Sequence, residues 1–136
     1  MTRRETPAGI VADVTRRMEA ILAVFDDDLE RLEGMMRPSP GDIVLSPDEW
    51  KAAHRARGRV AESLRSLEEN ADAAVRNAAD WRRRAEIADG EGRVEMANQA
   101  RKRGDIAEAE SRIYLTEAEV VRQFLRDWDA RVRPAQ

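Results

Sequence analysis

The residues whose spacing could first support chemistry are the two glycines of the segment Asp89-Gly90-Glu91-Gly92. Closely spaced glycines let backbone N–H groups approach a phosphate, as in the loops that hold nucleotides. This segment lacks the Gly-Lys-Ser/Thr of such loops, no strand is expected before it, and the carboxylates of Asp89 and Glu91 would repel an anion. A turn between two helices, with the glycines at positive φ, is the favoured interpretation, and a phosphate site is the alternative.

Catalytic and metal-binding chemistry lacks its usual residues. There is no Cys, and the sequence contains a single His, His54. Disulfides and Cys nucleophiles are therefore excluded, while zinc sites and Ser-His-Asp triads lack their usual ligand and base. The carboxylates of Asp26, Asp27 and Asp28 could bind a cation, but consecutive helical residues point in different directions, so a solvated acidic face is favoured. We expect no enzyme activity, no cofactor and no metal ion.

The composition indicates long helices with narrow buried seams. Of the 136 residues, 42% are hydrophobic, 38% are charged and 4% are aromatic, and the net charge is −3. Lys51 and Lys102 are the sole lysines among 24 basic residues. Such an arginine bias reflects a GC-rich coding genome, so it does not argue for nucleic acid as a partner. Because no apolar run could span a membrane and the N-terminus lacks the apolar core of a signal peptide, the expected location is cytoplasmic.

Apolar residues recur every three or four positions, which predicts an all-α fold. The expected architecture is an elongated three-helix coiled-coil bundle with a long antiparallel hairpin. The predicted helices cover about 8–36, 47–89 and 93–133. Residues 1–7 are expected to be a disordered basic N-terminus, 8–133 a single helical domain and 134–136 a tail.

A Pro-rich loop is expected at 37–46, because prolines interrupt a helix. Its segment Ile43-Val44-Leu45 should pack against the bundle as an apolar clip. Ser46 and Glu49 form a capping-box pattern around Pro47, which predicts the start of the second helix. Arg57 is the one misfit in the seam of that helix, and we expect it to pair with Glu62, Glu117 or a neighbouring chain, or to extend its head to solvent.

Folding the chain back at 90–91 places large side chains opposite small ones near the turn. Trp81 then faces Ala100, and Ala85 lies further along the same seam. Ala97 and Gly104 flank Ala100 on the opposing helix. This complementarity is what an antiparallel helical hairpin requires, since small residues let the two backbones approach closely.

The hairpin resembles the central hairpin of the phage-shock-protein A (PspA/IM30) family in the spacing Trp81-x₃-Ala85-Glu86-Ile87-Ala88-x₃-Gly92-x₃-Met96-Ala97-x₂-Ala100. The resemblance extends in pattern from Trp50 to Val132. It implies a long antiparallel hairpin, assembly related to ESCRT-III filaments, a role in envelope stress or membrane maintenance, and binding to a partner ATPase activator or anionic lipid. An acidic helix and the Pro-rich loop replace the family's N-terminal membrane helix, and its C-terminal helices have no counterpart, so polymerisation and lipid remodelling are not carried over.

Two basic clusters should lie opposite each other in the folded hairpin: Arg82, Arg83 and Arg84, and Arg101, Lys102 and Arg103. Such a patch could contact anionic lipid or an acidic protein surface. The alternative is a solvated face with ion pairs inside each helix to Asp80, Glu86 and Asp105.

The function favoured by these features is a non-catalytic helical adaptor, regulator or oligomer-forming protein. It would bind a protein partner through its helix faces, form homo-oligomers and contact an anionic membrane peripherally, at the inner membrane. The alternative is a coiled-coil scaffold or chaperone-like module without a membrane role. A nucleic-acid-associated protein is a third class and is disfavoured by the acidic balance. A weaker resemblance, to the turn of a tetratricopeptide repeat at Ala100-x₃-Gly104-Asp105, lacks the repeated period of that fold.

Overall fold

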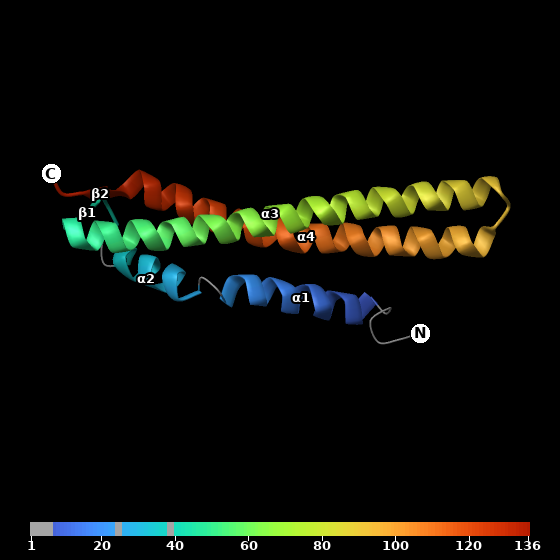
Figure 1. Ribbon diagram of the computed structural model, residues 1–136, viewed down its shortest axis with the longest axis horizontal. Helices are drawn as coiled ribbons and strands as arrows, with labels where there is room; N and C mark the ends of the chain where they lie inside the picture. Colours follow the sequence, from blue (N-terminus) through green and yellow to red (C-terminus); the bar gives the residue numbers. More distant parts are fainter. Residues whose placement is uncertain (1–6, 24–25, 38–39) are drawn as a thin grey trace. The chain divides into compact units, whose positions relative to one another are not determined.

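The structure is a computed structural model that describes residues 7–23, 26–37 and 40–136, and it is mostly helical (Figure 1). The all-α expectation is therefore confirmed. Within these ranges the chain forms four helices and two short strands, namely α1 (Pro7–Ala23), α2 (Asp26–Met36), β1 (Ile43–Leu45), α3 (Pro47–Gly90), α4 (Val94–Arg131) and β2 (Val132–Pro134).

The first expected helix, 8–36, is described as α1 and α2. Residues 24–25, which include Phe25 of the predicted seam, lie outside the described residues. The same holds for residues 1–6 of the expected basic N-terminus and for 38–39 of the Pro-rich loop.

Two compact units divide the chain. The tip unit comprises Met1–Met18 and Glu68–Thr116, and the strand unit comprises Glu19–Leu67 and Glu117–Gln136. Both units contain part of α3 and part of α4, so each is built around a pair of neighbouring helix segments.

In the tip unit, α3 and α4 pack through small residues. The buried side chains of this seam include Ala71, Ala74, Ala78, Ala85 and Ala88 on α3 and Ala97, Ala100, Ala107 and Ser111 on α4. Gly104 lies at the closest approach, where an added Cβ would stand 3.3 Å from Cγ of Arg82 and 3.5 Å from the carbonyl oxygen of Ala78. The small side chains thus let the two backbones come close, as the hairpin pattern required.

The hairpin turn is a Schellman motif at the end of α3. The N–H of Arg93 donates to the carbonyl of Ala88 (2.8 Å), and the N–H of Gly92 donates to the carbonyl of Asp89 (3.1 Å). Gly92 has φ +74° and is the one residue with positive φ in the described ranges. Gly90, for which a positive φ was also expected, instead belongs to the last turn of α3.

In the strand unit, β1 and β2 form a parallel pair, with Ile43 opposite Val132 and Leu45 opposite Pro134. The predicted third helix, 93–133, therefore ends earlier, at Arg131, and residues 132–134 are extended. Ile43-Val44-Leu45 was expected to pack as a clip, and it does so as a strand whose Leu45 side chain is buried.

The expected capping box is present at the start of α3. The backbone N–H of Ser46 donates to the Glu49 carboxylate (3.1 Å), and the backbone N–H of Glu49 donates to the Ser46 hydroxyl (3.3 Å).

Two arginines near the start of α3 fix its neighbours within the strand unit. Arg59 donates to both carboxylate oxygens of Asp28 on α2, at 2.6 and 2.8 Å. Arg57 donates to both oxygens of Asp129 on α4, at 2.9 and 2.6 Å, rather than to the expected Glu62 or Glu117. Asp28 is 8% exposed, and its hydrogen bonds from Arg59 lower the pKa of its carboxyl. The Arg59–Asp28 and Arg57–Asp129 pairs are both bidentate, because each arginine binds the two oxygens of one carboxylate. Such contacts are the stronger class of ion pair.

We expect Asp28→Asn to lower the free energy of unfolding at pH 7 by about 1.5 kcal/mol, because a charge-assisted pair is lost. The pKa of Asp28 is lowered in the folded state, so its contribution is present above the usual pKa of 3.8 and is lost as the pH falls through the folded-state value. Urea unfolding at pH 7 and pH 3, followed by circular dichroism, measures this. The control is Asp72→Asn, an exposed acid of α3 in the tip unit. A difference between wild type and Asp28→Asn that is equally large at both pH values would contradict the assignment.

We expect Gly92→Ala to destabilise the protein by about 1 kcal/mol, because an L-residue with a Cβ is strained at positive φ. Gly90→Ala is the matched control, since Gly90 is helical and an added Cβ would meet no atom within 4 Å. That substitution should leave stability unchanged or raise it slightly. Thermal unfolding of the two variants compares them directly, and an equal effect would show that the turn does not depend on its left-handed residue.

Candidate functional site

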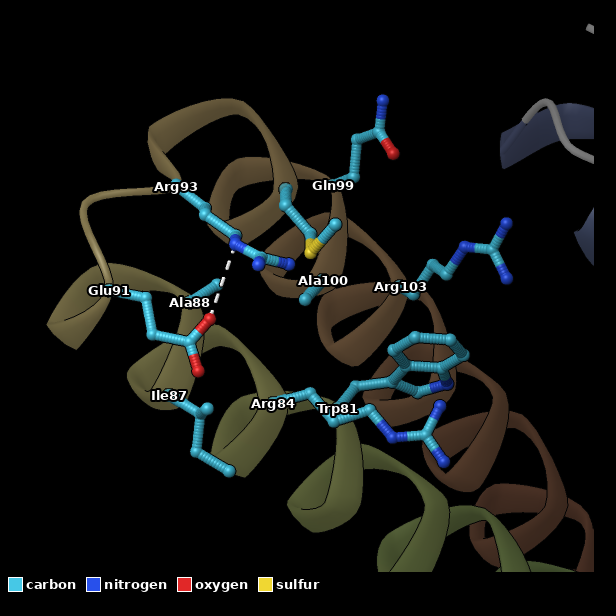
Figure 2. A pocket seen from close by; sticks show the side chains of 10 residues that line it. Trp81, Arg84, Ile87, Ala88, Glu91, Arg93, Gln99, Ala100 and Arg103 are labelled. Carbon is cyan, nitrogen blue, oxygen red and sulfur yellow. Dashed lines mark ion pairs between the residues drawn. The ribbon is translucent and has the colours of Figure 1, made fainter.

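An open groove of about 490 Å³ lies in the tip unit, between the last turns of α3 and the first turns of α4 (Figure 2). Its floor contains the small residues Ala88 and Ala100, and larger side chains stand around them. The groove is lined by Trp81, Arg84, Ile87, Ala88, Glu91, Arg93, Met96, Gln99, Ala100 and Arg103. Its lining is therefore a mixture of apolar and cationic groups.

The guanidinium groups of Arg84 and Arg103 lie over the indole ring of Trp81. The Cζ atoms of Arg84 and Arg103 lie 4.6 and 4.9 Å from the ring centroid, and Figure 2 shows both side chains beside the ring. At these distances the ring quadrupole attracts each cation. Trp81 was expected only to pack in the hairpin. Its Cβ would lie 3.6 Å from a Cβ added at Gly104 of the opposing helix, and Trp81 is also partly exposed at the groove. The spacing of Trp81 and Arg84, three residues apart on one helix, was the available signal for this contact.

Large apolar side chains are exposed around the turn. Ile87 is 55% exposed and Met96 is 54% exposed, and both line the groove. Val94, at the start of α4, is 64% exposed. Apolar side chains grouped on a surface and surrounded by polar residues are characteristic of interaction sites.

The six residues of the predicted anionic-partner patch have different environments. Arg82 pairs with Glu108 and reaches Asp105 at 3.9 Å, and Arg84 pairs with Asp80 at 3.0 Å. Arg101 pairs with Asp89 at 2.6 Å. The expected pair within one helix is thus present at Asp80, whereas Asp105 of α4 is approached by Arg82 of α3 and not by a residue of its own helix. Within the described part of the chain, Arg83 and Lys102 are exposed and have no acidic partner, and no pair to Glu86 forms.

The glycine turn itself is unsuited to holding a phosphate. Its N–H groups at residues 91–93 donate to carbonyl oxygens of residues 87–89, so they are already used in ending α3. Glu91 contributes to the groove, but its carboxylate is held by Arg93 at 3.2 Å.

The described residues hold neither a metal-binding cluster nor a membrane-spanning helix. Over that part of the chain, no cluster of three or more His, Asp or Glu side chains has an arrangement that would hold a metal ion. None of the helices described there has the length and apolar character needed to cross a bilayer.

Comparison with known proteins adds no assignment to this geometry. The chain matches no protein-family model, no curated protein and no solved structure.

Proposed function

We propose that this chain is a non-catalytic helical adaptor that binds an acidic, amphipathic segment of a partner protein in the groove of the tip unit. The observation that carries the proposal is the combination of exposed Ile87 and Met96 with the guanidinium groups of Arg84, Arg93 and Arg103 around one groove. Apolar side chains of the partner would cover the two apolar residues, and its carboxylates would meet the arginines.

The apolar contacts would supply most of the affinity. Covering a large aliphatic side chain contributes about 1.5–3 kcal/mol, but association also costs translational freedom and side-chain order. A groove of this size therefore fits a transient complex in the micromolar range, about −8 kcal/mol. The exposed arginines would mainly raise the association rate and select for acidic partners.

An acidic protein segment fits the groove better than an anionic bilayer fits the turn. Residues 87–96 carry three carboxylates, of Asp89, Glu91 and Glu95, and one guanidinium, of Arg93. A flat anionic membrane surface at the turn would meet all three acids, whereas a segment in the groove would meet Arg84 and Arg103 and, of the three acids, only Glu91, which Arg93 pairs. Peripheral membrane contact, which the resemblance to the phage-shock-protein family implies, is the alternative.

We further propose that α1 and α2 act as the third helix of a coiled-coil bundle. In the tip unit, Arg17 of α1 pairs with Glu110 of α4 at 2.8 Å, and Val14 is fully buried. In the strand unit, Leu32 of α2 is fully buried, and Asp28 is held by Arg59 of α3. These contacts within each unit support a third helical layer beside its own α3–α4 pair.

The groove proposal predicts binding of a synthetic helical peptide with a leucine face flanked by glutamates. Fluorescence anisotropy of the labelled peptide should give a micromolar Kd that weakens as salt is raised. Replacing Ile87 and Met96 by Ser should weaken binding about tenfold or more, because both apolar contacts are lost.

The matched control is Val75→Ser, which removes a side chain of α3 that is 51% exposed and does not line the groove. A peptide of the same composition in scrambled order controls for charge alone. Equal affinity of the wild type and the Ile87→Ser/Met96→Ser variant would contradict the proposal. Flotation with phosphatidylglycerol vesicles, without peptide binding, would favour the membrane alternative.

Exposed apolar residues away from the groove favour a second candidate function, a homo-oligomer subunit. Leu115 and Val120 of α4 are 46% and 61% exposed. If Val120 lies in a contact between copies of the chain, light scattering on the size-exclusion peak should give a mass that rises with concentration to a multiple of 15.4 kDa. Val120→Arg should then return the mass to that of one chain, whereas Ile87→Ser should not. A single-chain mass at all concentrations would remove the oligomer.

A further inference from the structure

Another cavity, in the strand unit, has a mostly cationic lining, in which four of the six residues are arginine or lysine. Its volume is about 210 Å³. We call it the basic cleft, and its lining residues are Arg31, Asp48, Lys51, Ala52, Arg55 and Arg59. Arg31 comes from α2 and the others from the first turns of α3, so the cleft is formed where these two helices meet. It shares no residue with the tip groove.

Three of its cations form a row along α3. Lys51, Arg55 and Arg59 are spaced by four residues, so they lie above one another on one face of the helix. Like charges at this spacing repel each other and destabilise a helix. Arg31 adds a fourth cation from the facing helix. The mutual repulsion of these four cations is unfavourable in the absence of an anion. The positive charge is concentrated at this site although the net charge of the chain is −3.

Nearby acids compensate this charge only in part. Asp28 neutralises Arg59 through its two hydrogen bonds, and Asp48 is the one acid in the lining. Glu49, the next acid on α3, is engaged in the capping box with Ser46. Over the described residues, Arg31, Lys51 and Arg55 have no acidic group within ion-pair distance. Four cations against the two acids Asp28 and Asp48 leave an excess of two positive charges around the cleft.

We propose that the basic cleft binds the phosphoryl group of a soluble ligand, inorganic phosphate or a phosphomonoester, between Arg31, Lys51 and Arg55. A phosphoryl group carries close to two negative charges at neutral pH, which matches the excess, whereas a single carboxylate would leave one positive charge uncompensated. Guanidinium groups suit phosphate because their N–H groups form parallel hydrogen bonds to two of its oxygens, and a lysine adds a point charge. A bound dianion would also remove the repulsion along α3.

Arg59 acts here as a positioning residue. Its hydrogen bonds to Asp28 fix the distance between α2 and α3, and with it the place of Arg31 opposite Lys51 and Arg55. Ligand binding should therefore stabilise the contact between the two helices, since a ligand that binds only the folded state raises its stability.

The test is isothermal calorimetry of the full chain with inorganic phosphate at constant ionic strength, paired with thermal unfolding in phosphate and in chloride. We expect a saturable heat and a phosphate-dependent rise of Tm. Arg31→Gln and Lys51→Gln should each weaken binding about tenfold, since each removes charge-assisted hydrogen bonds to the ligand. Arg76→Gln, an exposed arginine of α3 in the tip unit, is the matched control and should bind as the wild type does.

Several results would overturn the proposal. One is the absence of a saturable heat at millimolar phosphate, and another is unchanged binding in Arg31→Gln and Lys51→Gln. An equal rise of Tm in acetate would show that the cleft does not select a dianion. Vesicles that contain phosphatidic acid form a further arm: binding to these vesicles without binding to free phosphate would assign the cleft to a lipid headgroup and not to a soluble ligand. The peptide affinity of the tip groove should not change in phosphate, because the two sites share no residue.

Discussion

The close approach of α3 and α4 is the constraint on which the tip unit depends. Near the turn the seam consists of alanines, whereas Tyr114, further from the turn, is buried. An added Cβ at Gly104 would stand 3.3 Å from Cγ of Arg82, so a large side chain would not fit there. Trp81, the largest residue of the expected seam, therefore lies partly exposed at the edge, where Arg84 and Arg103 hold it. The same small residues leave a hollow between their larger neighbours. The packing that closes the hairpin thus also creates the groove.

In the strand unit, ion pairs join α3 to its neighbours beside a buried core that holds larger side chains such as Leu32, Val60 and Trp128. Arg57 and Arg59 are two positions apart and contact different helices, Asp129 on α4 and Asp28 on α2. The cost of placing several arginines on one helix is the like-charge row that includes Arg59. In that unit the interactions that locate α2 also concentrate positive charge beside it.

The sequence predicted the regular parts of this fold and missed the contacts that depend on tertiary pairing. Periodic apolar residues, the capping box at Ser46 and Glu49 and the glycine turn were sufficient for α3, α4 and the hairpin. The strand pair was missed because Val132 continues the helical period and no local signal shows that it pairs with Ile43. For the candidate sites, the basic residues of the tip were predicted, but their contact with Trp81 was not. The basic cleft was missed altogether, because it joins Arg31 to residues of another helix.

The arginines of this chain differ in what they contribute, and the difference separates its two candidate sites. Several of them form exposed ion pairs, such as Arg84 with Asp80, and these add little to stability. At the tip groove, the cations also lie on an aromatic ring and beside exposed apolar side chains, so a ligand must be both acidic and apolar to satisfy the surface. In the basic cleft, the lining offers Ala52 as its one apolar residue. A ligand of the basic cleft would therefore interact almost entirely through its charge, which favours a small, highly charged anion over a protein segment.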